Sequence, residues 1–282
     1  AAMKEAATPE EMKTKLGLKI IRRSNSIGHH YFIANLTDHD IKATVKPATG
    51  ERNALWYNPM TDEFNRADVY NNGIMINLRS GESRILLSSG RPLNDWGISD
   101  SIARAPYRKY ADEDSRAIDI TKEKWSLSFT EEAPRVKQGY KLNRLQTWES
   151  LGDSAAVTMG TGVYTTSFKL SAEDSRRNWQ IDLGDVRESA RVYINDIYVG
   201  CAWAVPFVLD CKNALRKGRN TIRIEVTNLP ANRIADMERR GIKWRKMKEI
   251  NMVDINYKKT TYENWAPVAS GLNGSVILRE IK

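Results

Sequence analysis

The sequence has little of what redox, metal and acyl-transfer sites require. Its 282 residues include two cysteines and three histidines. Cys201 and Cys211 fit either a short disulfide loop or free buried thiols, and the second interpretation is the one favoured. None of the histidines at positions 29, 30 and 39 has a catalytic partner that the sequence can show. The sequence therefore gives no indication of nucleophilic catalysis.

Long apolar runs are also missing. No run approaches the roughly 20 residues of a membrane-spanning helix. The N-terminus lacks the basic and then apolar pattern of a signal peptide, so we expect a mature, truncated or mid-chain start.

The formal net charge is +9, which permits anionic partners such as nucleic acid or acidic polysaccharide. Because the charges are interspersed and no recognition motif accompanies them, nucleic acid is not expected as a partner.

Alternation of apolar and polar residues dominates the C-terminal half. It runs through 179–183, 190–194 and 222–227, which is typical of half-buried antiparallel strands. Asn195-Asp196 predicts the tip of a tight hairpin, because Asn and Asp tolerate positive φ. Short strands at this spacing predict a sandwich or jelly roll.

The N-terminal part predicts a second, smaller β unit. A strand at 29–35 is followed by a turn and a return strand at 41–45, and 58–63 has hairpin chemistry. Before it, Thr8 and Glu11 predict a capped helix, interpreted as the tail of a missing domain. The predicted organisation is all-β, with two antiparallel β-sandwich domains and a short N-terminal helix. Its predicted boundaries are a helix at 1–17, an accessory β-sandwich at 18–90, a connector at 91–117 and a jelly roll at 118–282.

Several phrases of the sequence resemble known families. IDLG at 181–184, ARVYIND at 190–196 and GRN at 218–220 resemble the sugar-binding-type, galactose-binding-like jelly roll of glycoside hydrolase family 2. YFIAN at 31–35 and LWYNPMT at 55–61 are similar to the accessory β-domain that precedes this jelly roll in the α-L-rhamnosidases of family 106. The resemblance implies a β-rich C-terminal region of such a hydrolase.

The resemblance also implies a function for the chain. The catalytic barrel of these hydrolases is built of βα repeats and needs roughly 250 residues, and no such alternation is present. We therefore expect a non-catalytic portion, secreted or periplasmic, that braces a catalytic domain of the same polypeptide and contacts carbohydrate, including acidic plant polysaccharide. The alternatives are an independent carbohydrate-binding module or adhesin, a fragment of a β-galactosidase-like family 2 hydrolase, and a complete enzyme with an unfamiliar site.

Sugar rings stack their C–H faces on aromatic side chains and pair their hydroxyls with polar ones. The candidate carbohydrate-binding residues are Trp203, Asn232, Arg233, Trp244 and Trp265. For Trp203 the competing prediction is a plug at one end of the sandwich core. The candidates after position 228 lie in a predicted long loop with a single helical turn.

That loop carries a basic run from Arg239 to Lys248, which we interpret as a surface for acidic polysaccharide. No catalytic or metal-ligating residue is predicted. The acidic triplet at 112–114 does not have the spacing of a calcium loop. The prediction for cofactors is therefore none, with a structural calcium ion left open.

Overall fold

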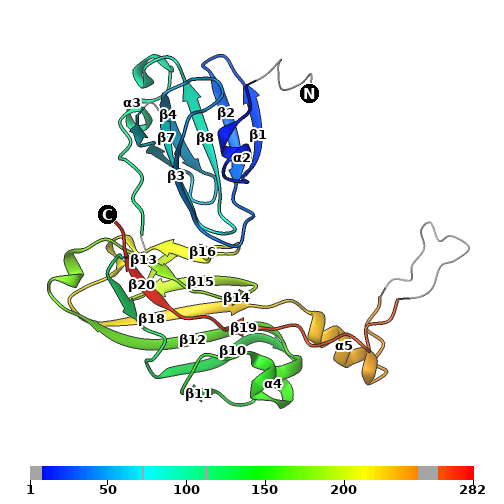
Figure 1. Cartoon of the computed structure of the whole chain (residues 1–282). Coiled ribbons are helices and arrows are strands. Elements are labelled where there is room, and N and C mark those ends of the chain that lie inside the picture. The colour runs from blue at the N-terminus through cyan, green and yellow to red at the C-terminus, as the bar shows by residue number, and fades with distance from the viewer. Residues whose placement is uncertain (1–7, 72, 112–113, 247–259) are drawn as a thin grey trace, which may run out of the picture. The chain divides into compact units, whose positions relative to one another are not determined.

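The computed structural model describes residues 8–71, 73–111, 114–246 and 260–282. The chain divides into two compact units, Ala1–Tyr110 with Lys282, and Ala111–Ile281. Both consist of antiparallel strands with few helices (Figure 1), which confirms the predicted all-β fold class. The division between the units falls inside the predicted connector at 91–117.

The N-terminal unit contains two sheets. A five-stranded sheet has the order β1-β2-β8-β4-β5, and a three-stranded sheet has the order β3-β7-β6. Their apolar side chains enclose one core, which includes Tyr31, Trp56 and Ile76. The strands are β1 (Lys19–Ser24), β2 (His29–Ala34), β3 (Ile41–Val45), β4 (Asn53–Asn58), β5 (Glu63–Arg66), β6 (Val69–Tyr70), β7 (Gly73–Leu78) and β8 (Ser83–Ser89).

The N-terminal helix is part of this unit. Helix α2 (Glu11–Thr14) buries Met12 completely in the core of the N-terminal unit. The predicted capping box does not form, because the Glu11 carboxylate accepts the Lys46 backbone N–H at 3.0 Å instead. The described part of this segment therefore packs into the core of the N-terminal unit.

The chain crosses between the two sheets after β2. The predicted return strand at 41–45 forms, but β3 pairs with β7 and not with β2. Asn35 fixes the crossing, since its fully buried amide donates to the carbonyls of His39 and Leu78 at 2.9 and 3.1 Å. Alternation in the sequence identified the buried face of each strand. The pairing of β3 with β7 depends on the Asn35 side chain, which alternation does not reveal.

The segment after β8, the first part of the predicted connector, is folded onto the N-terminal unit. Glu82, immediately before β8, accepts hydrogen bonds from Arg84 at 2.8 Å and from Arg108 at 2.5 Å. Arg108 also donates to the Asn77 carbonyl at 2.8 Å. Burial by itself disfavours a charged carboxylate, but Arg108 and Arg84 outweigh this effect and hold the pKa of Glu82 below its ordinary value. The segment contains η1 (Leu93–Asp95) and α3 (Asp100–Ala103).

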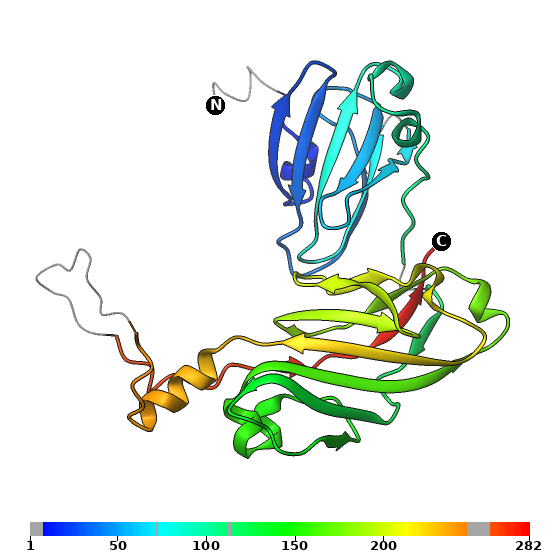
Figure 2. The same cartoon turned by 180° about the vertical axis from the view of Figure 1, so that it is seen from behind.

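The C-terminal unit is a larger sandwich. A six-stranded sheet has the order β11-β10-β12-β18-β15-β16, a four-stranded sheet has the order β17-β13-β20-β9, and β14 pairs with β19. Figures 1 and 2 show the long strands β12 and β18 running side by side along this unit. The strands are β9 (Ala117–Asp119), β10 (Trp125–Ala133), β11 (Tyr140–Leu142), β12 (Met159–Leu170), β13 (Trp179–Asp182), β14 (Val186–Arg187), β15 (Ser189–Ile194), β16 (Ile197–Ala202), β17 (Val208–Asp210), β18 (Gly218–Thr227), β19 (Gly271–Leu272) and β20 (Ile277–Glu280). The helices are η2 (Trp148–Leu151), α4 (Asp153–Val157), η3 (Asp174–Arg176), η4 (Lys212–Ala214) and α5 (Ala231–Arg239).

Local sequence predictions in this unit are confirmed. Asn195 and Asp196 have φ values of 51° and 64°, and Ile194 pairs with Ile197 across them. The two-residue hairpin is thus the predicted one. Both cysteines are free. Cys211 is buried, as the favoured interpretation has it, whereas Cys201 is half-buried.

Trp148 organises the core near one end of this sandwich. Its ring is fully buried, and its indole N–H donates to the Tyr164 hydroxyl at 2.7 Å. The same hydroxyl accepts the Leu272 backbone N–H at 3.1 Å, which fixes β19 beside β12. Gly162 and Gly271 leave room for the indole, because a Cβ at either position would lie 2.5 Å from a ring atom of Trp148. Burial raises the pKa of Tyr164 to about 12, so its hydroxyl stays protonated.

Candidate functional site: the arm of the C-terminal unit

A helical arm extends from the sandwich between β18 and β19. We define the arm as residues 229–246 and 260–269, with α5 at its centre. In Figures 1 and 2 it leaves the end of β18 and projects away from the sheets. The sequence predicted a loop with one helical turn here, but α5 is a nine-residue helix. Four of the five candidate carbohydrate-binding residues lie on this arm.

Polar side chains fasten the arm to the sandwich. The Asn228 amide donates to the Thr158 carbonyl at 3.0 Å and to the Ser270 hydroxyl at 3.1 Å, so the outgoing and returning segments share one anchor. The Glu149 carboxylate accepts from the Asn232 amide at 2.9 Å and from the Ser270 backbone N–H at 3.2 Å. The root of the arm is therefore a defined structure.

Asn232 and Arg233 are held within the protein. Asn232 is buried, and its amide donates to the Val268 carbonyl and accepts the Val268 N–H, both at 2.8 Å. Arg233 pairs with Asp236 on the same helix at 3.0 Å. Since the Asn232 amide is used by Glu149 and Val268, its role in the structure is to join α5 to the sandwich and to the returning segment.

Trp244 and Trp265 belong to one aromatic cluster. Tyr262 lies between them, with ring centroids 6.0 Å from Trp244 and 4.5 Å from Trp265. The Arg245 guanidinium lies over Trp244 and Tyr262, at 5.2 and 5.3 Å from the ring centroids. Trp265 is 48% exposed, so part of its surface is available to a ligand. Tyr262 was not among the predicted residues, although its spacing of three from Trp265 was a signal.

Glu238 links this cluster to α5. Its carboxylate accepts hydrogen bonds from the Tyr262 backbone N–H, from the Trp244 indole and from Arg245. The Tyr262 N–H makes the largest contribution to holding the pKa of Glu238 below its ordinary value. The charged form is thus bound more strongly in the folded arm than in the unfolded chain.

We expect Glu238→Ala to release the cluster without unfolding the sandwich. Exchange of the Tyr262 amide should rise about tenfold, because this amide loses its acceptor. In the unsubstituted chain its protection should hold above the ordinary glutamate pKa of about 4.3 and fall as the pH drops through the lower folded value. Hydrogen exchange followed by mass spectrometry measures this. Glu263→Ala, an exposed carboxylate on the same arm, should leave the Tyr262 amide unchanged; equal effects of both variants would contradict the assignment.

Trp203 lies apart from the arm. It is in the loop between β16 and β17 and is 60% exposed. Val205, in the same loop, is 57% exposed. The prediction that Trp203 plugs the core is therefore wrong; Phe207 is the buried aromatic of this loop. In the described part of the chain, no hydrogen bond or ring contact joins Trp203 to the arm.

The basic run of the arm is partly neutralised. Arg240 pairs with Asp236 at 3.3 Å and Arg245 pairs with Glu238 at 3.3 Å. Arg239 donates to the Glu263 carbonyl at 3.3 Å. The last member of the predicted run, Lys248, lies outside the described residues. Structural use of these arginines leaves less positive charge for an acidic ligand than the sequence suggested.

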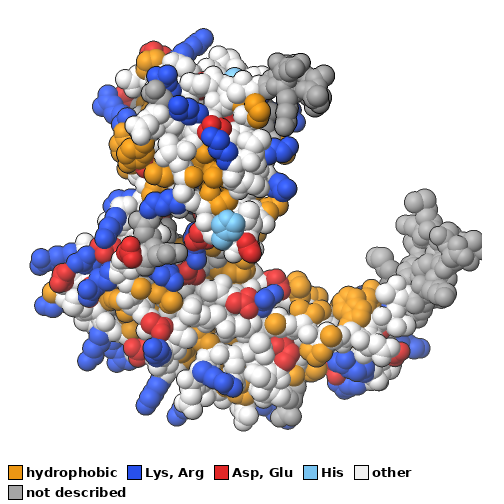
Figure 3. Space-filling model, in the orientation of Figure 1, with side chains coloured by type: hydrophobic (Ala, Val, Ile, Leu, Met, Phe, Trp, Pro, Cys, Tyr) orange, Lys and Arg blue, Asp and Glu red, His pale blue; other side chains and the backbone are white. Residues whose placement is uncertain are grey.

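The surface of the arm is also apolar. Figure 3 shows hydrophobic side chains gathered over the arm, whereas Lys and Arg are scattered over both units. The exposed apolar residues there include Leu229 at 49% and Ile242 at 37%, in addition to Trp265. A surface of this kind suits contact with sugar faces or with another protein surface.

A domain-family model matches much of the C-terminal unit. Residues 152–270, which cover β12 to the root of the arm, match the family described as glycosyl hydrolase 2 galactose-binding domain-like. Residues 152–270 of the C-terminal unit are thus similar to a galactose-binding-like domain. The arm lies inside the matched range, between strands β18 and β19.

Similar proteins are much longer than this chain. A rhamnosidase from Novosphingobium sp. PP1Y has a similar structure, with a TM-score of 0.62 and 22% identity, over 93% of this chain and 24% of that one. A Formosa agariphila protein named "Putative beta-glucuronidase" is 28% identical over 171 residues, which are 54% of this chain and 15% of that protein. A β-glucuronidase structure from Bifidobacterium dentium matches with a TM-score of 0.43 and 17% identity, over 60% of this chain and 30% of that chain. The likeness to the rhamnosidase is a likeness of fold, and it covers residues of both units.

The described residues contain no group of three or more His, Cys, Asp or Glu side chains placed to hold a metal ion. The predicted acidic triplet lies mostly outside them, since 112–113 are not described. No described helix is both long enough and apolar enough to span a membrane.

Proposed function

We propose that this chain is a non-catalytic portion of a glycoside hydrolase, most like an α-L-rhamnosidase, that braces the catalytic domain and contacts carbohydrate through the arm. The observation that carries the proposal is the likeness of both units to a stretch that makes up 24% of a rhamnosidase chain. The parent enzyme would be secreted or periplasmic, where polymeric glycans are accessible, and fractionation of cells that produce it tests this location.

The carboxylates on the arm and at its root support a structural role for this part of the chain. Glycoside hydrolysis generally uses two carboxyl groups about 5 to 10 Å apart across a cleft. Glu149, Asp236 and Glu238 are each engaged by the side chains or backbone of the arm itself. A carboxylate held in this way serves as an anchor for its neighbours.

Assays of the purified chain test the absence of catalysis. Incubation with aryl-rhamnoside, aryl-galactoside and aryl-glucuronide should release no aglycone above the buffer control. Turnover on the order of 1 s⁻¹, an ordinary enzymatic rate, would make the chain an enzyme in its own right. Titration calorimetry of the same preparation with neutral oligosaccharides then separates carbohydrate contact from a purely bracing role.

The carbohydrate contact has a matched pair of variants. We expect Trp265→Ala to weaken binding of a neutral oligosaccharide about tenfold, because a stacking face supported by Tyr262 is lost. Trp203→Ala removes an exposed indole from the other loop and should change the affinity less than twofold. Calorimetry with both variants decides between the two tryptophans. A larger loss for Trp203→Ala would move the contact to the β16–β17 loop.

A further inference from the structure

A polar groove lies on the outer face of the six-stranded sheet, away from the arm. It has a volume of about 450 Å³ and is lined by strands β10, β12, β15 and β18 together with Lys124. A second hollow of about 410 Å³ continues from it, with Ser167 and Arg219 common to both. Each volume is within the range of about 300 to 1,000 Å³ that small-molecule sites occupy. Two joined hollows suit a chain of sugar units better than a single compact ligand.

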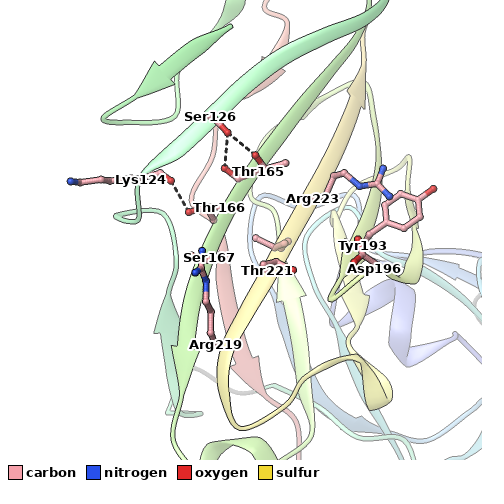
Figure 4. A pocket seen from close by; sticks show the side chains of 11 residues that line it. Lys124, Ser126, Thr165, Thr166, Ser167, Tyr193, Asp196, Arg219, Thr221 and Arg223 are labelled. Carbon is pink, nitrogen blue, oxygen red and sulfur yellow. Dashed lines mark hydrogen bonds between the residues drawn. The ribbon is translucent and has the colours of Figure 1, made fainter.

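Strand register builds the floor of the groove. Ser126 pairs with Thr165, Thr165 with Arg223, and Arg223 with Tyr193, so that these side chains form one row across the floor. Tyr198 on β16 pairs with Tyr193 and continues the row beyond the lining of the groove. Figure 4 shows the hydroxyl groups of Ser126 and Thr165 on neighbouring strands and Arg223 beside the Tyr193 ring. Hydroxyls, a guanidinium and an aromatic face are the groups that recognise a pyranose ring.

Arg223 and Tyr193 are fixed in position before any ligand arrives. The guanidinium lies 3.8 Å from the Tyr193 ring centroid, and it is paired with Glu225, which also pairs with Arg191 at 3.2 Å. Tyr198 lies next to Tyr193, with centroids 5.3 Å apart, and is 55% exposed. A stacked and paired side chain loses little entropy on binding, so this end of the groove is preorganised.

The other end of the groove carries positive charge. Lys124 and Arg219 line the first hollow, and Arg219 and Lys169 line the second. Within the ranges that the structure describes, no ion pair engages any of these three side chains. The lining also includes one carboxylate in each hollow, Asp196 and Glu123, so cations outnumber anions there. A groove with this balance attracts an anionic ligand.

We propose that this groove binds an acidic oligosaccharide, a chain of pyranose units that carry uronate carboxylates. One sugar face packs against the exposed Tyr198 ring, which Tyr193 supports, and the hydroxyls of Ser126, Thr165 and Thr221 pair with sugar hydroxyls. The guanidinium of Arg219 receives a carboxylate, whose planar shape it matches in a two-point contact, and Lys124 adds a second positive charge. This site does not depend on the arm or on the role of the chain in a larger enzyme.

Binding of tetragalacturonate to the full 282-residue chain tests the proposal. Calorimetry in 150 mM salt should show binding that weakens as the salt concentration rises, and neutral galactotetraose should bind at least tenfold more weakly. Lys124→Ala combined with Arg219→Ala should weaken tetragalacturonate binding at least tenfold, and Tyr193→Ala about fivefold. Lys137→Ala combined with Arg176→Ala removes the same charge from exposed sites elsewhere on this unit and should leave the affinity within twofold.

Additional variants and ligands distinguish binding in the groove from binding elsewhere. Trp265→Ala should not alter tetragalacturonate binding, so failure of the arm contact and failure of the groove are distinguishable. Circular dichroism melting curves of all variants establish that they are folded, which is expected because Lys124 and Arg219 are exposed. The proposal is overturned by absence of binding at millimolar ligand, by equal affinity for galactotetraose, or by an unchanged affinity of the double variant. Stronger binding of a sulfated galactotetraose would overturn the uronate assignment.

Discussion

Replacing Trp148 with Ala should destabilise the C-terminal unit by about 3 to 5 kcal/mol, the usual cost of truncating a fully buried tryptophan. The ring has no exposed surface, and its removal opens a cavity beneath Gly162 and Gly271. The Tyr164 hydroxyl also loses its donor, while it still accepts the Leu272 N–H. Chemical denaturation followed by a signal specific to this unit, such as hydrogen exchange of β12, gives the free energy of unfolding.

Trp203→Ala is the matched control for this variant. The side chain has the same size but is 60% exposed, so its removal should cost less than about 1 kcal/mol. Trp148→Phe should fall between the two, because it keeps part of the apolar volume but not the indole N–H. A loss below 1 kcal/mol for Trp148→Ala would show that the core closes around the cavity and that Trp148 does not organise β12 and β19.

Replacing Glu82 with Ala should cost the N-terminal unit about 3 to 5 kcal/mol, because it removes one partner of a buried ion pair and leaves the other charge behind. Arg108 is the charge left without its partner, and its side chain is only 10% exposed.

The stabilisation by Glu82 should depend on pH. The folded pKa of Glu82 is lowered, so its stabilisation is present above the ordinary value of about 4.3 and is lost as the pH falls through the lower folded pKa. Stability measured between pH 3 and 7 should therefore rise with pH more steeply in the unsubstituted chain than in the variant.

Asp100→Ala provides the comparison for an exposed pair. Asp100 and Arg104 are 3.7 Å apart with side chains 90% and 80% exposed, and such pairs contribute about 0 to 1 kcal/mol. If Glu82→Ala were no more destabilising than Asp100→Ala, the segment from β8 to Tyr110 would not be held by this carboxylate. The predicted connector at 91–117 would then be the better description.

The parts of the fold that were predictable from the sequence depend on near neighbours. Positive φ at Asn195 and Asp196 follows from the chemistry of those two residues, and the hairpin formed as expected. Alternation likewise assigned a buried face to β15 and β18. Pairing between β3 and β7 was not predictable, because it depends on a buried Asn35 that reaches Leu78, 43 positions away.

The candidate sites were predictable to a smaller extent for the same reason. Trp244 and Trp265 were selected by residue type, but Tyr262, which brings them together, has significance only once α5 and the returning segment are side by side. Asn232 was selected because an amide side chain can bind sugar hydroxyls, but its amide instead contacts Glu149 and Val268. The groove was not predicted at all, because the row from Ser126 to Tyr198 exists only after five strands have found their register.

The closed root of the arm makes it a place where evolution or engineering can exchange one loop for another. Asn228 and Glu149 hold the outgoing and returning chain together without help from residues farther out. Lengthening a loop whose ends are already fixed is inexpensive, since each doubling adds only about 0.6 kcal/mol of closure entropy. A foreign recognition loop spliced between Ala231 and Val268 would have to restore only the Asn232 contact to leave the sheets undisturbed.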